Sequence, residues 1–229
     1  MKKICIITSS KDLQELISNT LFDGSAPVRS NGGLLGFWGN CQVLVVMTRS
    51  GKVNVAVTVS EVVNDIRPDA VIIAGMASSL SSTLLPGSLI VGSHFCYYDV
   101  CFGLNMDFGR YPDEPKYYHS DDRIVSRMIE TGLTFHQGLM LSGDSLVDSR
   151  PAARKILNHF GKARALDMES TPAAHVCNRN AVPFVSIRVI DSVPVMDDKA
   201  KVMYPQFKFT NEDLHERLFA VLNKTMESL

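Results

Sequence analysis

Short apolar runs alternate along this chain with stretches in which apolar residues recur every three or four positions. Continuous apolar runs are typical of strands buried on both faces, and three-to-four spacing is typical of helices that pack by one side. The pattern predicts strands at residues 4–8, 70–74, 89–98, 138–141, 165–168 and 184–190. It also predicts helices over 10–21, 51–66, 121–130, from 151 onward, 173–178 and 212–226, and a hairpin over 31–48 that turns near 39–40.

Buried strands separated by helices indicate an α/β fold of three α/β/α layers. We expect a mixed, largely parallel, twisted central sheet with helices on both faces. The 229 residues contain no repeat, low-complexity tract or linker. A chain of this length can bury a sizeable core, so we expect residues 1–229 to form one domain.

Composition narrows the classes of partner. The formal net charge is −1 and no basic block stands out, which argues against nucleic-acid binding. No apolar run approaches the length of a membrane span, and the run near the start covers only four residues, shorter than a secretory signal requires. The five cysteines are scattered, without the close pairs of a zinc site. We therefore expect a cytoplasmic protein with reduced thiols and no metal.

The segment 163–176 carries the most informative polar residues. A short apolar strand ends in Asp167, Met168 and Glu169, and a Ser-Thr-Pro helix start follows. The carboxyl ends of strands in an α/β sheet face the ligand crevice. Strand alternation predicts both carboxylates on one side and Met168 on the other. The alternative is an acidic helix cap in which Glu169 complements the helix dipole.

Other strand ends carry small or polar residues that we expect to meet there: Thr8–Asp12, Gly75–Ser78, Ser142–Asp144 and Arg188–Ser192. Arg188 stands inside an apolar strand. A buried arginine needs an anion, and Asp191, Glu169 or a substrate are the candidates.

Ordered motifs extend this pattern over nearly the whole chain. They are Lys-Ile-x-Ile-Ile at the start, Ser-Gly-Lys-Val at 50–53, Arg-Pro-Asp-Ala-Val-Ile at 67–72, Leu-x-Pro-Gly-Ser-Leu-Ile-Val at 84–91, Leu-Ser-Gly-Asp at 141–144, Asp-Met-Glu-Ser at 167–170, Ala-His-Val-Cys at 174–177 and Val-Pro-Phe-Val at 182–185. In this order and spacing the chain resembles the nucleoside phosphorylase superfamily, within it the methylthioadenosine/S-adenosylhomocysteine nucleosidases.

The resemblance implies cleavage of the bond between a purine and C1′ of a ribose, without a cofactor. Such a reaction uses an acid for the leaving base, a carboxylate that activates water, and a group that holds the ribose and its developing charge. The resemblance places Glu169 on the ribose hydroxyls, with Met168 packed against the sugar. It places the acid in the segment 188–192 and the water-activating carboxylate after the first strand.

The chain departs from the family pattern at these acids. The family ends its late strand with Ser-Asp, whereas this chain has Asp191 followed by Ser192. If the register is kept, Ser192 takes the acid's place; if it shifts by one residue, Asp191 does. After the first strand, an ungapped match puts Leu13 at the family's glutamate, and a loop shorter by one residue puts Asp12 there. Asp167 replaces a glutamate.

The predicted substrate contacts depart as well. Leu146 and Val147 stand where the family stacks an aromatic ring on adenine, and Met76 and Ala77 begin a bulkier version of the family's Ser-Ala-Gly-Gly. Together with Asp167, Met168, Arg188 and Ser192 they form our predicted substrate-binding set, beside catalytic Asp12, Glu169 and Asp191.

Three activities stay open. A phosphorylase needs an oxyanion site, and the loop 8–12 has no arginine, so water is the favoured acceptor. A binder of nucleosides or bases that has lost catalysis is the alternative. Convergence of Asp12, Asp191 and Glu169 on one pocket would favour the enzyme. The aromatic-rich stretch 95–118 predicts a homodimer contact, or else a loop that packs on itself.

Overall fold

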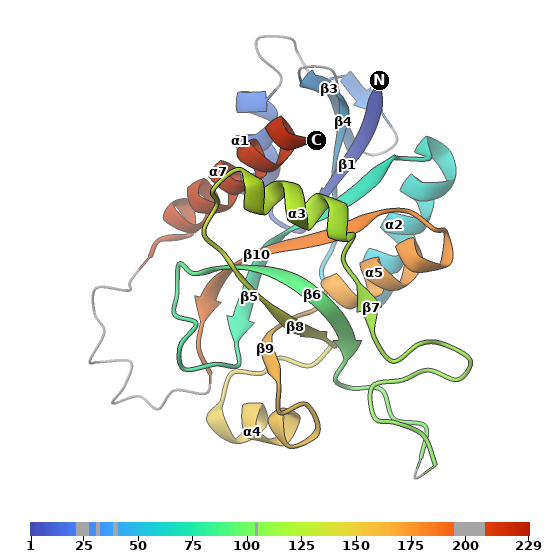
Figure 1. Ribbon diagram of the computed structural model, residues 1–229, viewed down its shortest axis with the longest axis vertical. Helices are drawn as coiled ribbons and strands as arrows, with labels where there is room; N and C mark the ends of the chain where they lie inside the picture. The colour runs from blue at the N-terminus through green and yellow to red at the C-terminus, as the bar shows by residue number, and fades with distance from the viewer. Residues whose placement is uncertain (22–27, 31–32, 39–40, 104, 195–208) are drawn as a thin grey trace.

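The computed structural model describes residues 1–21, 28–30, 33–38, 41–103, 105–194 and 209–229 (Figure 1). Its strands pair into one sheet in the order β10-β6-β8-β9-β5-β1-β4-β3-β2, with β7 beside β6. They are β1 (Lys2–Thr8), β2 (Val28–Ser30), β3 (Gly33–Trp38), β4 (Cys41–Met47), β5 (Ala70–Ser79), β6 (Leu89–Tyr97), β7 (Tyr118–His119), β8 (His136–Ser142), β9 (Ala163–Asp167) and β10 (Phe184–Ser192).

The sheet is mixed, as predicted. β1 pairs in parallel with β4 and β5, β5 with β10, and β8 with β6 and β9, whereas β2–β3, β3–β4, β5–β9, β6–β7 and β6–β10 are antiparallel. The sequence did not predict that five strands close into a ring. β5, β10, β6, β8 and β9 each pair with the next, and β9 returns to β5 through Ser78 opposite Leu166.

Helices cover both faces of this sheet (Figure 1). They are α1 (Lys11–Leu21), α2 (Lys52–Ile66), α3 (Asp122–Glu130), α4 (Arg150–His159), α5 (Ser170–Arg179) and α7 (Asn211–Ser228). The alternation of β1 assigns the faces: Ile4 and Ile6 pack with α1, α3 and α7, while Cys5 and Ile7 pack with α2 and α5. The predicted helix-flanked α/β architecture is confirmed.

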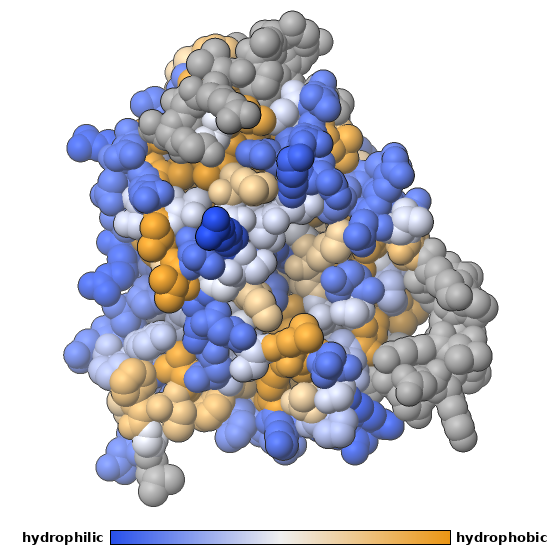
Figure 2. Space-filling view, turned by 180° about the vertical axis from the view of Figure 1, so that it is seen from behind, coloured by the Kyte–Doolittle hydropathy of each residue, from blue (hydrophilic) through white to orange (hydrophobic). Residues whose placement is uncertain are grey.

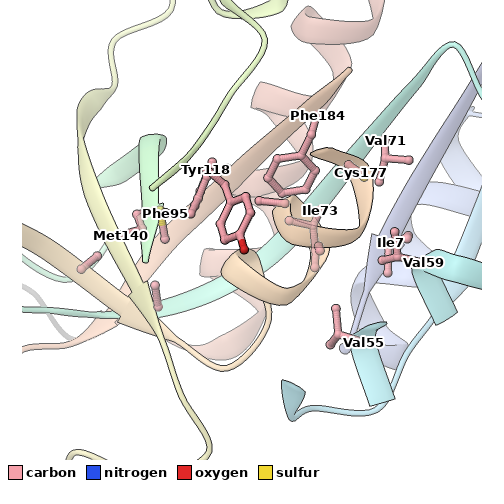
Figure 3. Close-up of a cluster of buried hydrophobic side chains, with 14 of the residues drawn as sticks. Ile7, Val55, Val59, Val71, Ile73, Phe95, Tyr118, Met140, Cys177 and Phe184 are labelled. Atoms are coloured by element: carbon pink, nitrogen blue, oxygen red, sulfur yellow. The ribbon is translucent and has the colours of Figure 1, made fainter. Parts of the chain in front are cut away.

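The core on the α2–α5 side is dense with branched and aromatic side chains (Figure 3). Ile7 and Ile73 of the sheet meet Val55 and Val59 of α2. Farther along, the rings of Phe95 and Phe184 pack edge to face with centroids 5.3 Å apart. This packing fixes the strands whose carboxyl ends carry the polar residues.

Element bounds differ from the prediction in a few places. β5 continues to Ser79 beyond the predicted end at residue 74, because its Gly75–Ser78 stretch pairs with β10 and β9. α5 begins at Ser170, before the predicted 173. The predicted hairpin is present as antiparallel β3 and β4, and its turn at 39–40 lies outside the described residues.

One face of the molecule is seen in the space-filling view (Figure 2). Figure 2 shows apolar residues divided into small patches by hydrophilic side chains. Among the helices of the described ranges, none combines the length and apolar character that crossing a bilayer requires.

Candidate active site

A cavity of about 360 Å³ lies at the carboxyl ends of β1, β5, β9 and β10. This is the edge at which ligands bind in open α/β sheets. Its walls come from segments far apart in the sequence: Ser9, Ser10, Asp12, Ser50, Gly75, Met76, Ala77, Ser78, Ser145, Leu146, Val147, Leu166, Asp167, Met168, Glu169, Asp191, Asn211 and His215.

The three predicted catalytic carboxylates all line this cavity. Asp12 comes from the first turn of α1, Glu169 from the turn between β9 and α5, and Asp191 from the end of β10. Asp12, and not Leu13, faces the cavity, because Leu13 is fully buried against the core. The geometry therefore brings the three acids around one hollow.

Arg188 lies completely buried beneath the cavity, between two carboxylates. Its Nη1 is 2.6 Å from Glu169 Oε2, and its Nε is 3.0 Å from Asp167 Oδ2. Burial by itself lowers the pKa of Arg188, but the charges of Asp167 and Glu169 outweigh this and raise the pKa. Glu169 is one of the anions predicted for the buried arginine, and the other partner is Asp167, which was not among the predicted candidates.

The two carboxylate oxygens of Glu169 bind two different partners. Oε2 accepts from Arg188, and Oε1 accepts a 2.9 Å hydrogen bond from the Ser50 hydroxyl. Gly75 makes room for this arrangement, because a Cβ built there would stand 2.4 Å from Arg188 Nη1. Glu169 is consequently held at the cavity wall with its negative charge fixed in place.

Asp167 is the residue that caps α5. Its Oδ1 accepts from the backbone N–H groups of Glu169 at 3.0 Å and Ser170 at 3.1 Å, and from the Ser142 hydroxyl at 2.6 Å. Ser170 Oγ donates to Oδ2. The acidic helix start and the acidic site are therefore both present, but Asp167, and not the N-cap residue Glu169, supplies the hydrogen bonds at the start of α5. Glu169 makes no capping hydrogen bond from its side chain.

Met168 lines the cavity together with its two acidic neighbours, so its predicted place on the opposite side is wrong. The reason is local. β9 ends at Asp167, and strand alternation does not extend into the turn that follows. Asp144, which we expected among the converging strand ends, does not line the cavity; its Oδ1 accepts from the backbone N–H of Lys52 at 2.8 Å.

A β-bulge sets the position of Asp191. Ile190 pairs with Ala77 and Ser192 pairs with Ser78, which leaves Asp191 as an extra residue between them. This is the one-residue shift that decides between the two expected registers. Asp191 faces the cavity, and Ser192 does not line it.

Asp191 and Ser192 are nevertheless linked. Ser192 Oγ donates a 2.7 Å hydrogen bond to Asp191 Oδ1 and lies 2.7 Å from Ser78 Oγ. The surrounding protein takes water from the Asp191 carboxyl and raises its pKa, and the bond from Ser192 partly offsets this. A raised pKa makes Asp191 a better proton donor near neutral pH than an ordinary aspartate.

Apolar residues form a second wall. Met76, Ala77, Leu146, Val147 and Leu166 line it. Val147 is 5% exposed and anchored in the core, whereas Leu146 is 75% exposed. Of the predicted substrate-binding set, only Arg188 and Ser192 lie behind the lining residues. Across the described ranges, no three His, Cys, Asp or Glu side chains gather as metal ligands would.

Sequence reasoning missed the contribution of the last helix. Asn211 and His215 of α7 line the cavity, although they follow the nearest predicted site residue by about twenty positions. The signal was present but weak: two polar residues four apart share one helix face, just after the Thr210 capping box. Ser50 was also missed as a site residue, although its motif was noted.

Comparisons with known proteins give the family of the chain. The model of the phosphorylase superfamily matches residues 3–227. The 5′-methylthioadenosine/S-adenosylhomocysteine nucleosidase of an Exiguobacterium species is 30% identical over 200 residues, covering 84% of each chain. The nucleosidase of the same name from Halalkalibacterium halodurans is 32% identical over 173 residues, covering 72% of this chain and 73% of its own.

Solved structures share the fold. The S-adenosylhomocysteine nucleosidase of Streptococcus pyogenes, in complex with 5-methylthiotubericidin, superposes with a TM-score of 0.85 at 26% identity, over 100% of this chain and 97% of its own. The futalosine hydrolase of Helicobacter pylori superposes with a TM-score of 0.85 at 22% identity, over 100% and 98%.

The chain therefore belongs to the phosphorylase superfamily. Its homologues at about 30% identity are hydrolases of nucleoside N-glycosidic bonds, named for methylthioadenosine and S-adenosylhomocysteine.

Proposed function

We propose that this protein hydrolyses the N-glycosidic bond of a purine nucleoside. The observation that carries the proposal is that Asp12, Glu169 and Asp191, from three separate segments, line one cavity. Three carboxylates match the three tasks of the reaction: donating a proton to the leaving base, activating water, and balancing positive charge on the sugar. Nothing in a purely structural cavity requires acids at all three places.

The roles follow from the environment of each acid. Asp191 has a raised pKa because burial outweighs the hydrogen bonds to its carboxyl, the Ser192 hydroxyl among them, which suits an acid to the base. Asp12 is exposed at the cavity, where it can contact and activate a water molecule. Glu169 is fixed by Arg188 and Ser50, which suits a group that holds the ribose hydroxyls.

The remaining predicted contacts complete a nucleoside site. Met76, Ala77, Leu146 and Val147 offer an apolar wall to the flat purine. Met168 packs on the sugar beside Glu169. Arg188 and Ser192 act from behind the wall, because Arg188 holds Asp167 and Glu169 and Ser192 bonds to Asp191. Asp167 lines the cavity beside Glu169.

The decisive experiment measures release of free base from a panel of nucleosides, with and without phosphate. The panel contains methylthioadenosine, S-adenosylhomocysteine, adenosine, inosine and purines with bulky 5′ substituents. Release without phosphate supports hydrolysis and names the substrate, and release only with phosphate supports a phosphorylase. Ligand binding without release supports the alternative of a nucleoside-binding protein, which the exposed Leu146 and the short Asp12 side chain favour.

A homodimer is the second part of the proposal. Val53 and Val57 on α2 are 73% and 51% exposed, and Phe102 is 51% exposed. Val53 and Val57 line a hollow with Tyr97 and Tyr111, and Phe102 packs on Tyr111 with centroids 5.6 Å apart. The aromatic stretch thus packs on itself and still leaves apolar surface, which a second copy of this chain would cover.

A further inference from the structure

His215 is a buried histidine inside the proposed active site that the acid roles leave unused. Its side chain projects from the second turn of α7, and the residue is 6% exposed. Its Nε2 lies 2.9 Å from Ser10 Oγ, and it shares the cavity wall with Asp12. A buried histidine with a side-chain partner in a reaction cavity is a candidate for holding a reacting group in place.

Ser10 links this histidine to Asp12. Its Oγ accepts a 3.2 Å hydrogen bond from the backbone N–H of Leu13, which is how a cap residue begins a helix. With its oxygen engaged as an acceptor, the hydroxyl hydrogen of Ser10 is free to be donated to His215 Nε2. The neutral ring that carries its proton on Nδ1 accepts this bond at Nε2 and fixes the cap, and the cap fixes the first turn of α1, where Asp12 stands.

The charges around the ring favour this coupling. Asp12 faces His215 from α1, Glu212 and Glu216 line a neighbouring hollow with it on α7, and Asp191 lines the main cavity from β10. Burial lowers the pKa of His215 below its ordinary 6.5, and Asp12 acts in the opposite direction. Burial thus favours the neutral ring, and its protonation at lower pH places a positive charge beside Asp12.

Resting on the proposed hydrolase function, we propose that His215 is a positioning residue that holds Asp12 through the Ser10 cap and weakens it as a base when the ring gains a proton. A cation beside the carboxylate stabilises its charged form, so that the carboxylate takes a proton from water less readily. Turnover then falls as the pH drops through the titration of His215, with a midpoint below 6.5.

The first test follows the ring itself and does not depend on turnover. Histidine NMR of the full chain titrates His215 in the wild type and in Asp12→Asn. We expect a wild-type midpoint below 6.5 that falls further in Asp12→Asn, because the variant removes the neighbouring negative charge. An identical midpoint in both proteins would overturn the coupling.

The second test compares pH profiles of base release for wild type, His215→Gln and His215→Phe. Glutamine can accept the Ser10 hydroxyl through its amide oxygen but does not titrate, so in this variant the acid limb should move to lower pH. Phenylalanine removes the acceptor, and kcat should fall about fivefold to tenfold, the scale of one hydrogen bond, with a smaller change in KM. His119→Gln is the control, because His119 also has a lowered pKa but does not line the cavity.

The outcomes separate the two proposals. An acid limb that stays at the wild-type pH in His215→Gln, or a wild-type kcat in His215→Phe, contradicts the positioning role while leaving the hydrolase intact. A wild type that releases no base from any nucleoside contradicts the hydrolase, and the NMR titration still decides whether His215 and Asp12 are coupled.

Discussion

Ser192 donates a 2.7 Å hydrogen bond to the carboxylate of Asp191, the residue that precedes it, at the β-bulge near the end of β10. Ser192 keeps the pairing with Ser78 of β5, and Asp191 is pushed out of the ladder toward the cavity. The inverted Asp-Ser order thus places a carboxyl in the cavity with a hydroxyl behind it. This relationship makes Asp191 the first residue to test.

Asp191→Asn should lower kcat by about 100-fold or more, because an amide cannot donate the proton that the leaving base requires. The fold should survive, since the side chain touches solvent and its main partner is Ser192. Asp148→Asn, at an exposed aspartate outside the cavity, is the matched control. Unaltered turnover in Asp191→Asn would remove Asp191 from the mechanism.

The pH dependence of kcat/KM tests the same acid by a different route. An acid works while protonated, so activity should fall as the pH rises through its pKa, and desolvation moves that pKa above the ordinary value of 3.8. The Ser192 hydrogen bond lowers the pKa, so Ser192→Ala should move the alkaline limb to higher pH. A limb that stays in place, or moves to lower pH, would show that Asp191 does not produce it.

The sequence was sufficient to predict the layers because burial controls them. Cys5 and Ile7 face one helix layer, and Ile4 and Ile6 face the other. The continuous apolar run at these positions in the sequence predicts a strand that is buried on both faces. Closure of the ring was not predictable, because it rests on the pairing of Ser78 with Leu166, two segments almost ninety residues apart. No local periodicity encodes such a contact.

The residues of the candidate site likewise fall into those that the sequence predicted and those that it did not. Asp12, Glu169 and Asp191 were predicted from their positions at strand ends together with the resemblance to the nucleosidases. The bulge at Asp191 left two registers open, because one extra residue in a ladder is a property of two paired strands. His215 was missed because its relation to Ser10 joins two helices that are about two hundred residues apart in the chain.

Arg188→Leu should lower the free energy of unfolding by about 3–5 kcal/mol, because it leaves two buried carboxylates without their cation. Urea denaturation at neutral pH measures this, with Arg154→Leu on the exposed side of α4 as the control. Equal losses in the two variants would mean that the buried ion pairs contribute nothing beyond an ordinary surface arginine.

Glu169→Gln separates charge from packing at the same place. The amide oxygen can still accept from Ser50 or Arg188, and Asp167 still pairs with Arg188, so the fold should persist. Turnover should fall strongly, because the site loses the negative charge that balances the sugar cation in the transition state. Circular dichroism would report whether the fold is kept, and single-turnover assays would report the loss of turnover. A Glu169→Gln variant with native kcat would exclude the ribose role.

Val57→Glu should convert a homodimer to monomers, because it places a charge in the apolar surface formed by α2 and the aromatic stretch. Light scattering after size exclusion reports the mass directly. Ile129→Glu, on α3 and 53% exposed, introduces the same charge away from that surface. A monomeric wild type, or a Val57→Glu protein that stays dimeric, would contradict the proposed contact.

Leu146→Phe tests where the purine lies. Leu146 is 75% exposed at the cavity wall beside the anchored Val147, so a larger ring has room to turn toward a bound base. Stacking is worth about 0.5–1.5 kcal/mol, which corresponds to a KM lower by about twofold to twelvefold. Ile129→Phe adds a ring at an exposed site outside the cavity and should leave KM unaltered. If Leu146→Phe raises KM for every purine of the panel, the base does not lie against this wall, and the apolar residues must contact another part of the substrate.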